Sequence, residues 1–315
     1  MLFKRSMPPR MSRWRIGRSM APKSSRWRIL PLWLSLAASL VCHSPAVASE
    51  NGRLLATGGA VPLDGAAGGG IVPWAMLSGY STNTEHGFTA AVTAVSSDDY
   101  ELRSFAASWN FRNRVEVSAA TQSFDIGVLS GALGFDPGEL EQDIVGVKLR
   151  LSGDVVYSRA PQVSVGLLSK RNDTFTIPAA VGARSDSGTE FYVAAAKAWL
   201  AGLFGRTTLV NLTMRSSNAN QTGLLGFGGD LRNSRSVLTE VAAAVFVNRR
   251  LAVGFEYREK PNNLSFATED NWYDLFVAFF PNKRFSVVGA FADLGSIAGI
   301  EGQNAFYVSV QGTFE

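Results

Sequence analysis

The stretch that decides the fold is the last one, residues 305–314, which read AFYVSVQGTF. Successive side chains of a strand point to opposite faces, so this run has one apolar face and one polar face. The apolar face carries Phe306, Val308, Val310, Gly312 and Phe314, and the polar face carries Tyr307, Ser309, Gln311 and Thr313. Ten residues are enough for a tilted strand to cross a bilayer. The run therefore predicts the closing strand of a membrane barrel, and an edge strand of a soluble sandwich is the alternative.

Similar short alternating runs fill the rest of the chain after residue 48, and the connections between them alternate in length. Counted back from the C-terminus, long loops and short turns follow one another, with a four-residue connection at 96–99 as the exception. Outer-membrane barrels have short periplasmic turns and longer outer loops, whereas a sandwich gives no reason for the alternation. We predict an all-β, transmembrane, antiparallel up-and-down barrel of 12–14 strands. Fourteen is preferred, because residues 53–59 and 72–81 also read as strands. The first of these should pair with residues 305–314, and both termini should be periplasmic.

The N-terminus resembles a secretory signal. Residues 29–41 form an apolar run behind a basic region, and Ala46-Val47-Ala48 fits the small-x-small pattern of a cleavage site. We predict a signal peptide at 1–48, with Met20 as a possible true start, export by the general secretory route, and a barrel at 49–315. Residues 1–48 hold nine of the 30 basic residues and no acidic one. The remaining 21 bases face 26 acids, so the basic balance of the whole chain does not indicate nucleic-acid binding.

Several stretches resemble an exported Gram-negative family known as domain of unknown function 3034. They are LLATGG (54–59), GAAGGGIVPWA (65–75), DSGTEFYVAA (186–195), ANQTGLLGFGGD (219–230), RLAVGFEYREKPNNLSF (250–266) and PNKRFSV (281–287). The resemblance covers nearly all of the chain after the predicted signal peptide. It implies an exported, β-rich protein and carries no assigned activity, cofactor or catalytic residue.

The residues offer little for catalysis or metal binding. After residue 48 the chain has one histidine, His86, and no cysteine. A Ser–His catalyst would need His86, which is expected in a periplasmic turn. One histidine without cysteine also makes a transition-metal site unexpected. We predict no cofactor, no metal and no enzyme activity, with an outer-membrane hydrolase as the weakest of three functional hypotheses.

Charged residues that alternate with the apolar faces should point into the barrel. They are Glu116, Lys148, Arg150, Lys170, Glu190, Arg215, Glu240, Glu256, Arg258 and Asp274. A buried charge must be paired or hydrated, and five acids against five bases give no ring of one sign. The glycine-rich run with Gly65, Gly68, Gly69 and Gly70 could fold into the lumen as a plug.

The leading hypothesis for function is a narrow outer-membrane channel or transporter for small polar solutes. The alternative is a closed, non-catalytic barrel that is structural or binds a partner through its outer loops. The expected partners are membrane lipid and the barrel-insertion machinery, which would engage the strand that ends at Phe314. No nucleic acid is expected, and the oligomeric state stays open.

Overall fold

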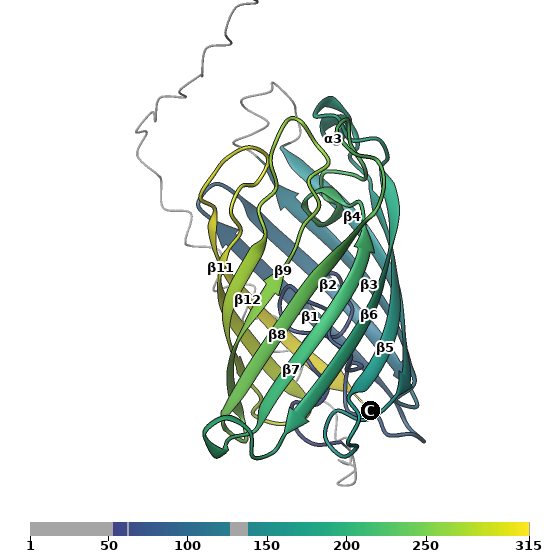
Figure 1. Ribbon diagram of the computed structural model, residues 1–315, viewed down its shortest axis with the longest axis vertical. Coiled ribbons are helices and arrows are strands. Elements are labelled where there is room, and N and C mark those ends of the chain that lie inside the picture. The colour runs from purple at the N-terminus through teal and green to yellow at the C-terminus, as the bar shows by residue number, and fades with distance from the viewer. Residues whose placement is uncertain (1–52, 62, 127–137, 315) are drawn as a thin grey trace, which may run out of the picture. The chain divides into compact units, whose positions relative to one another are not determined.

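The computed structural model describes residues 53–61, 63–126 and 138–314, and the predicted signal peptide lies outside these ranges. Twelve antiparallel strands form one closed barrel (Figure 1), in which each strand pairs with its neighbours along the chain. The strands are β1 (His86–Ser97), β2 (Glu101–Phe111), β3 (Val115–Asp125), β4 (Glu139–Ser152), β5 (Gln162–Asn172), β6 (Ser187–Trp199), β7 (Thr208–Ser217), β8 (Ser236–Asn248), β9 (Leu251–Arg258), β10 (Trp272–Phe279), β11 (Phe285–Asp293) and β12 (Asn304–Phe314).

The barrel closes between β1 and β12, whose register runs from Phe88 opposite Phe314 to Ser97 opposite Ala305. The predicted closing strand is confirmed, but its predicted partner is wrong. Residues 53–59 and 72–81 form no strand, so the barrel has twelve strands rather than the fourteen preferred from the sequence. Removing two strands leaves the number even, and both ends of the sheet still reach the same end of the barrel.

Residues 53–61 and 63–81, here called the inner segment, run inside the barrel as the purple coil of Figure 1. Their apolar side chains are buried: Val61, Val72 and Met76 have no exposed surface. Isolated bridges join Ala60 to Gly68 and Gly68 to Pro73, so the segment folds back on itself. Apolar residues at alternate positions predict strands at 53–59 and 72–81, and this prediction is wrong. The physical reason is that burial against the inner wall of the barrel produces the same alternating pattern as exposure to lipid.

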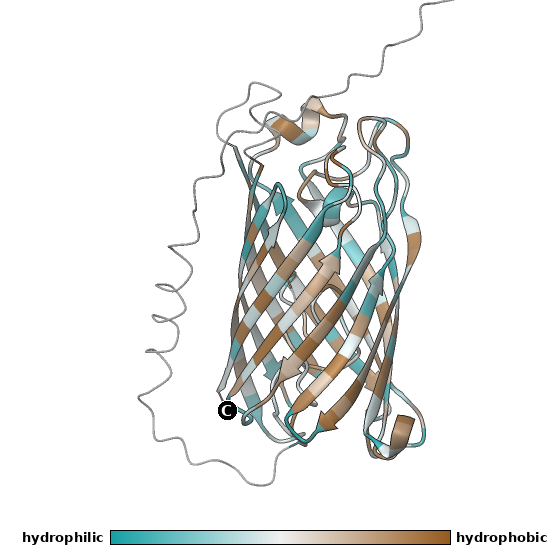
Figure 2. Ribbon diagram, turned by 90° about the vertical axis from the view of Figure 1, so that its left-hand side faces the viewer, coloured by the Kyte–Doolittle hydropathy of each residue, from teal (hydrophilic) through white to brown (hydrophobic). Residues whose placement is uncertain are grey.

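The outer surface of the barrel is apolar along most of each strand. Phe306 and Leu275 are each 68% exposed although both are paired within regular sheet. Figure 2 shows hydrophobic residues recurring along the strands, with hydrophilic residues more frequent where the strands approach the long loops. On β3 and β4 these outward residues are Asp125, Glu139, Glu141 and Asp143. Within the described residues, no helix is both long and apolar enough to cross a membrane.

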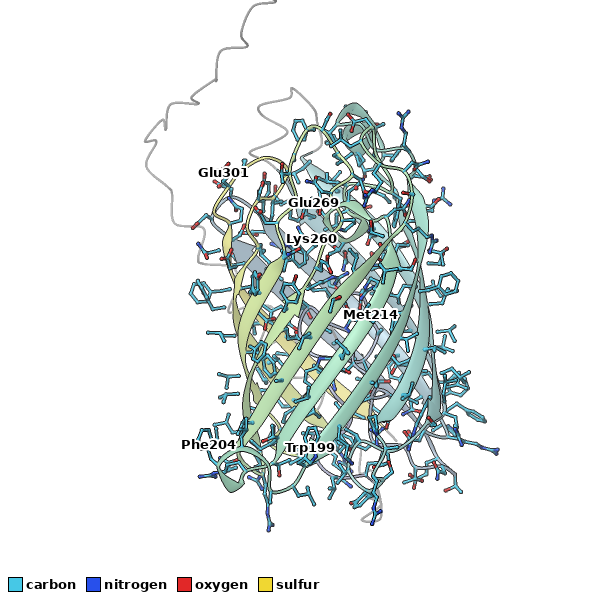
Figure 3. The ribbon with its side chains drawn as sticks, in the orientation of Figure 1. Trp199, Phe204, Met214, Lys260, Glu269 and Glu301 are labelled. Carbon is cyan, nitrogen blue, oxygen red and sulfur yellow. The ribbon has the colours of Figure 1, made fainter. Side chains whose placement is uncertain are left out.

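The two ends of the barrel differ in their connections. One end, here called the loop end, has the long connections with α3 (Thr176–Ala180) and η2 (Asn220–Gly223), and also the short connection at 98–100. The other, here called the turn end, has shorter connections, among them the one with η1 (Leu203–Gly205), and lies beside the C-terminus (Figure 1). Figure 3 labels Trp199 and Phe204 at the turn end, and Glu269 and Glu301 near the loop end.

Candidate functional site

Nine of the ten charged residues predicted to face the lumen are buried inside the barrel, each no more than 6% exposed. The exception is Arg150, which lies at the turn end of β4. It pairs with Asp154 in the following turn at 3.2 Å, with 13% of its side chain exposed. The interior charges fall into three groups with different partners.

Five consecutive strands, β5 to β9, each contribute one residue to the first group, here called the ion-pair arc. The signs alternate along it: Lys170, Glu190, Arg215, Glu240 and Arg258. Arg215 is its centre, 3.1 Å from the Glu190 carboxylate and 2.6 Å from that of Glu240. Every neighbour along the arc carries the opposite sign, but three bases face two acids, and the inner segment adds a third acid, Asp64, 3.9 Å from Arg215.

The second group, here called the carboxyl pair, is Glu256 on β9 and Asp274 on β10. The two residues are direct cross-strand partners. The backbone N–H groups of Gly70 and Ile71 donate to Glu256 Oε2 at 2.6 and 2.7 Å, and Trp74 Nε1 donates to Oε1 at 2.8 Å. Two acids side by side repel each other, so the inner segment supplies the donors that the wall does not.

The third group, Glu116 on β3 and Lys148 on β4, also holds the inner segment. The two side chains are 3.4 Å apart. Lys148 donates to the carbonyls of Ala67 and Met76, and Glu116 accepts from the N–H groups of Ala67 and Ser78. The pair thus binds the inner segment at two separate places.

The structure places the glycines that were considered as a plug inside the barrel. Gly69 and Gly70 lie against the carboxyl pair, where a Cβ atom on Gly69 would come 2.0 Å from Glu256 Oε1. Gly65 adopts a left-handed conformation, with φ of +84°, beside Ala120 of β3. Lack of a side chain is what lets the backbone approach the wall so closely here.

At the loop end, the connection at residues 218–235, here called the η2 loop, turns into the barrel mouth, where Lys170 of β5 donates to the Thr222 carbonyl. Lys260 donates to Gln221 Oε1 at 2.9 Å and pairs with Glu269 at 3.4 Å, while Glu269 also accepts from the Gln221 N–H. Figure 3 labels Lys260 and Glu269 in this region. Burial lowers the pKa of Lys260 and raises the pKa of Glu269, because each charged form loses hydration. Both directions weaken the charged pair that holds this loop.

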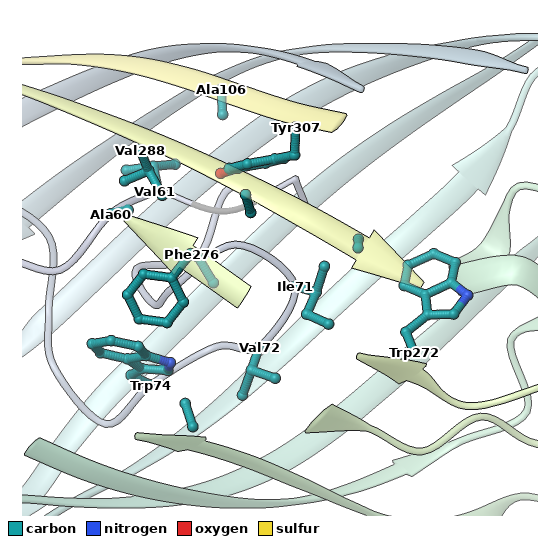
Figure 4. Packing of buried hydrophobic residues seen from close by; sticks show 14 of the residues in the cluster. Ala60, Val61, Ile71, Val72, Trp74, Ala106, Trp272, Phe276, Val288 and Tyr307 are labelled. Carbon is teal, nitrogen blue, oxygen red and sulfur yellow. The ribbon is translucent and has the colours of Figure 1, made fainter. Parts of the chain in front are cut away.

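A cavity of about 50 Å³ lies between the inner segment and the η2 loop. Ile71 borders it from the inner segment and Leu224 from the η2 loop. Aromatic side chains from three strands and the β1–β2 connection surround it: Phe124, Trp272, Tyr307 and Tyr100. Asp274 is the charged residue among its lining. Figure 4 shows Ile71 between Tyr307 and Trp272.

Sequence reasoning missed Asp64, which lies in the inner segment, and Gln221, Lys260 and Glu269, which lie in connections between strands. Asp64 is buried 3.9 Å from Arg215. Because it lies outside any strand, strand alternation could not predict that its side chain is buried. The alternating signs of the arc could have been found by aligning the charged positions of neighbouring strands.

His86 lies at the start of β1, exposed, with its ring 6.3 Å from that of Trp109. No hydrogen bond within the described ranges joins it to a hydroxyl or a carboxylate. In the same ranges, no three His, Cys, Asp or Glu side chains are arranged to hold a metal ion. The absence of enzyme activity and of a cofactor stays a prediction.

Comparison with known proteins gives a family. Residues 57–311 match the family model described as "Protein of unknown function (DUF3034)". No curated protein matches. Among solved structures, the KdgM porin is 9% identical with a TM-score of 0.46, covering 72% of this chain and 99% of its own.

Two further barrels are similar at the same level. Omp33 of Acinetobacter baumannii is 10% identical (TM-score 0.42; 74% of this chain, 100% of Omp33). The outer membrane phospholipase A of Escherichia coli is 10% identical (TM-score 0.38; 75% and 93%). A porin and a phospholipase share this likeness, so it says nothing about function.

Proposed function

We propose that this chain, which belongs to the DUF3034 family, is an outer-membrane barrel that forms a narrow channel for small polar solutes, with the inner segment as its gate. The apolar outer surface supports a location in a bilayer, since water would disfavour so many exposed aromatic and aliphatic side chains. With the turn end in the periplasm, as in other outer-membrane barrels, both termini would be periplasmic.

One observation supports a gating role for the inner segment. The backbone of the inner segment forms no ladder with any strand in the described part of the chain. Side chains of the wall hold it instead: Asn110 donates to the Ser78 carbonyl at 2.7 Å, and Gln162 and Ser164 both donate to that of Ala75 at 2.6 Å. The segment can leave without breaking a sheet hydrogen bond.

The wall behind the inner segment suits water once the segment has moved. Ser104, Asn110, Gln122, Asn211 and Thr213 all point inward and are buried. Buried polar groups cost free energy unless they are hydrogen-bonded, and water would replace the partners that the segment now provides. A permanently filled barrel could have an apolar wall here.

A reversible cross-link tests the gate. Gly65 and Ala120 belong to the inner segment and to β3, and a Cβ atom on Gly65 would lie 3.2 Å from that of Ala120. This is close to the Cβ separation of about 3.5–4.5 Å in disulfides. In planar bilayers, the variant Gly65→Cys/Ala120→Cys should be silent when oxidised and should conduct when reduced. The single variants should conduct in both conditions.

Two results would count against this function. Equal conductance of the oxidised and reduced double variant would contradict the role of the inner segment as a gate. Absence of conductance in the wild type, the single variants and the reduced double variant would contradict the channel itself.

The second candidate is a closed barrel that binds a partner through its loop end. The observation that favours it is closure from both sides, by the inner segment and by the η2 loop. A barrel of this kind would stay silent in bilayers, and shortening the 173–186 and 218–235 connections would abolish its partner binding while the barrel still folds.

A further inference from the structure

We propose that the cavity between the inner segment and the η2 loop binds a small alkylammonium ion, with Asp274 as its counter-ion and the surrounding aromatic rings as its wall. Binding is separate from conduction, so this inference does not depend on the proposed channel.

The first argument is the chemistry of the lining. Tyr100, Phe124, Trp272 and Tyr307 come from four parts of the barrel and surround one space. The faces of aromatic rings attract cations, and groups of such rings recognise alkylated ammonium ions. One ring of this set already has such a neighbour, because Lys260 Nζ lies 4.6 Å from the centre of the Trp272 ring.

The second argument is the free acceptor. Asp274 is 4% exposed, and within the described residues its Oδ1 atom has no hydrogen-bond partner. Its cross-strand neighbour Glu256 is another acid, whose oxygens are engaged by Gly70, Ile71 and Trp74. A buried acceptor without a partner is costly, and beside a second carboxyl group a cation is the ligand that would relieve it best.

The charged groups around the cavity agree with this assignment. Arg258 donates to the Ile71 carbonyl and pairs with Glu240 at 3.5 Å, and Lys260 pairs with Glu269. Both nearby bases are therefore engaged elsewhere, and neither forms a salt bridge with Asp274 in the described residues.

The volume restricts the ligand. A cavity of about 150 Å³ holds a benzene molecule, so about 50 Å³ accommodates an ion of only a few non-hydrogen atoms. Methylammonium fits this description: its methyl group would contact the rings, and its N–H groups would donate to Asp274.

The test uses the full chain in detergent and methylammonium chloride as the probe. Saturation-transfer NMR should show magnetisation passing from the protein to the methyl protons, in a saturable way, with sodium chloride holding ionic strength constant. Asp274→Asn should weaken binding by about tenfold or more, since a hydrogen bond to a charged group contributes roughly 1.5–3 kcal/mol. Asp293→Asn is the matched control on the exposed face and should bind as the wild type does.

A second variant tests whether the ligand occupies the cavity, while Asp274 is kept. Ala292 borders the cavity and is buried. Ala292→Leu should fill the space and abolish binding, while a cooperative thermal transition shows that the barrel remains folded. The inference is overturned if no saturable transfer is seen, if Asp274→Asn binds as tightly as the wild type, or if methanol, the neutral analogue, competes equally well.

Discussion

The ion-pair arc and the carboxyl pair adjoin each other on the inner wall, yet their buried charges have different kinds of partner. In the arc, neighbouring strands carry opposite charges, so the wall supplies most of the partners, and the inner segment adds Asp64 beside Arg215. In the carboxyl pair, two acids face each other across β9 and β10, and the donors come from the inner segment. The arc is thus stabilised mainly by the barrel wall, whereas the carboxyl pair depends on donors from the inner segment.

Breaking the arc should have the largest effect. Arg215→Met removes the base that Glu190 and Glu240 share and leaves each of these buried carboxylates with only one base of the arc, Lys170 or Arg258. Loss of one partner from a buried charge network costs about 3–5 kcal/mol, so the free energy of unfolding in urea should fall by that amount. Arg150→Gln, in the partly exposed pair at the turn end, should cost less than about 1 kcal/mol. Equal losses for the two variants would show that the arc is not structural.

Forcing the inner segment away from the carboxyl pair should have an intermediate effect. The Cβ atom of Gly69→Ala would displace Glu256 from its three donors. We expect a loss of about 1–3 kcal/mol, as for other overpacked sites, and faster cleavage of the inner segment by added protease. Gly289→Ala is the control, because its Cβ atom would meet nothing closer than 4.0 Å. If both variants resist protease as the wild type does, Glu256 does not hold the segment.

Removing one acid of the carboxyl pair should have the smallest effect, and in the opposite direction. Asp274→Asn keeps the shape of the side chain and ends the repulsion between direct cross-strand neighbours. Such like-charge pairs cost about 0.2–1 kcal/mol, so the thermal unfolding temperature should rise slightly. A clear decrease would mean that Asp274 stabilises the barrel through a contact other than the one with Glu256.

The same contrast explains what could be predicted from the sequence. Alternation along β12 and the other strands fixed which residues face inward, because a strand has only two faces. It therefore identified both Arg215 and Asp274. It could not identify their partners, since Gly70, Ile71 and Trp74 contact Glu256 from 182 to 186 residues away, through backbone and side-chain hydrogen bonds that follow no period.

The number of strands was wrong for a related reason. Residues 72–81 contain Val72, Trp74, Met76 and Tyr80, an alternation that is typical of a strand. In the structure these side chains are buried between the inner segment and the wall, so apolar spacing alone does not reveal whether lipid or protein covers a residue. The glycines at 65–70 were the better signal, since a run of this kind disfavours regular sheet.

The position of the inner segment directly before β1 has a consequence for biogenesis. Residues 82–85 connect it to β1, and β1 forms the seam with β12. The segment is made first and the strand that encloses it is made last. Because it enters from the end where β1 begins, it needs no threading through a closed ring. During assembly, β1 can pair with β12 only after β12 has been synthesised. A chain truncated before β12 would therefore leave the edge of β1 unpaired and the inner segment without a closed barrel around it.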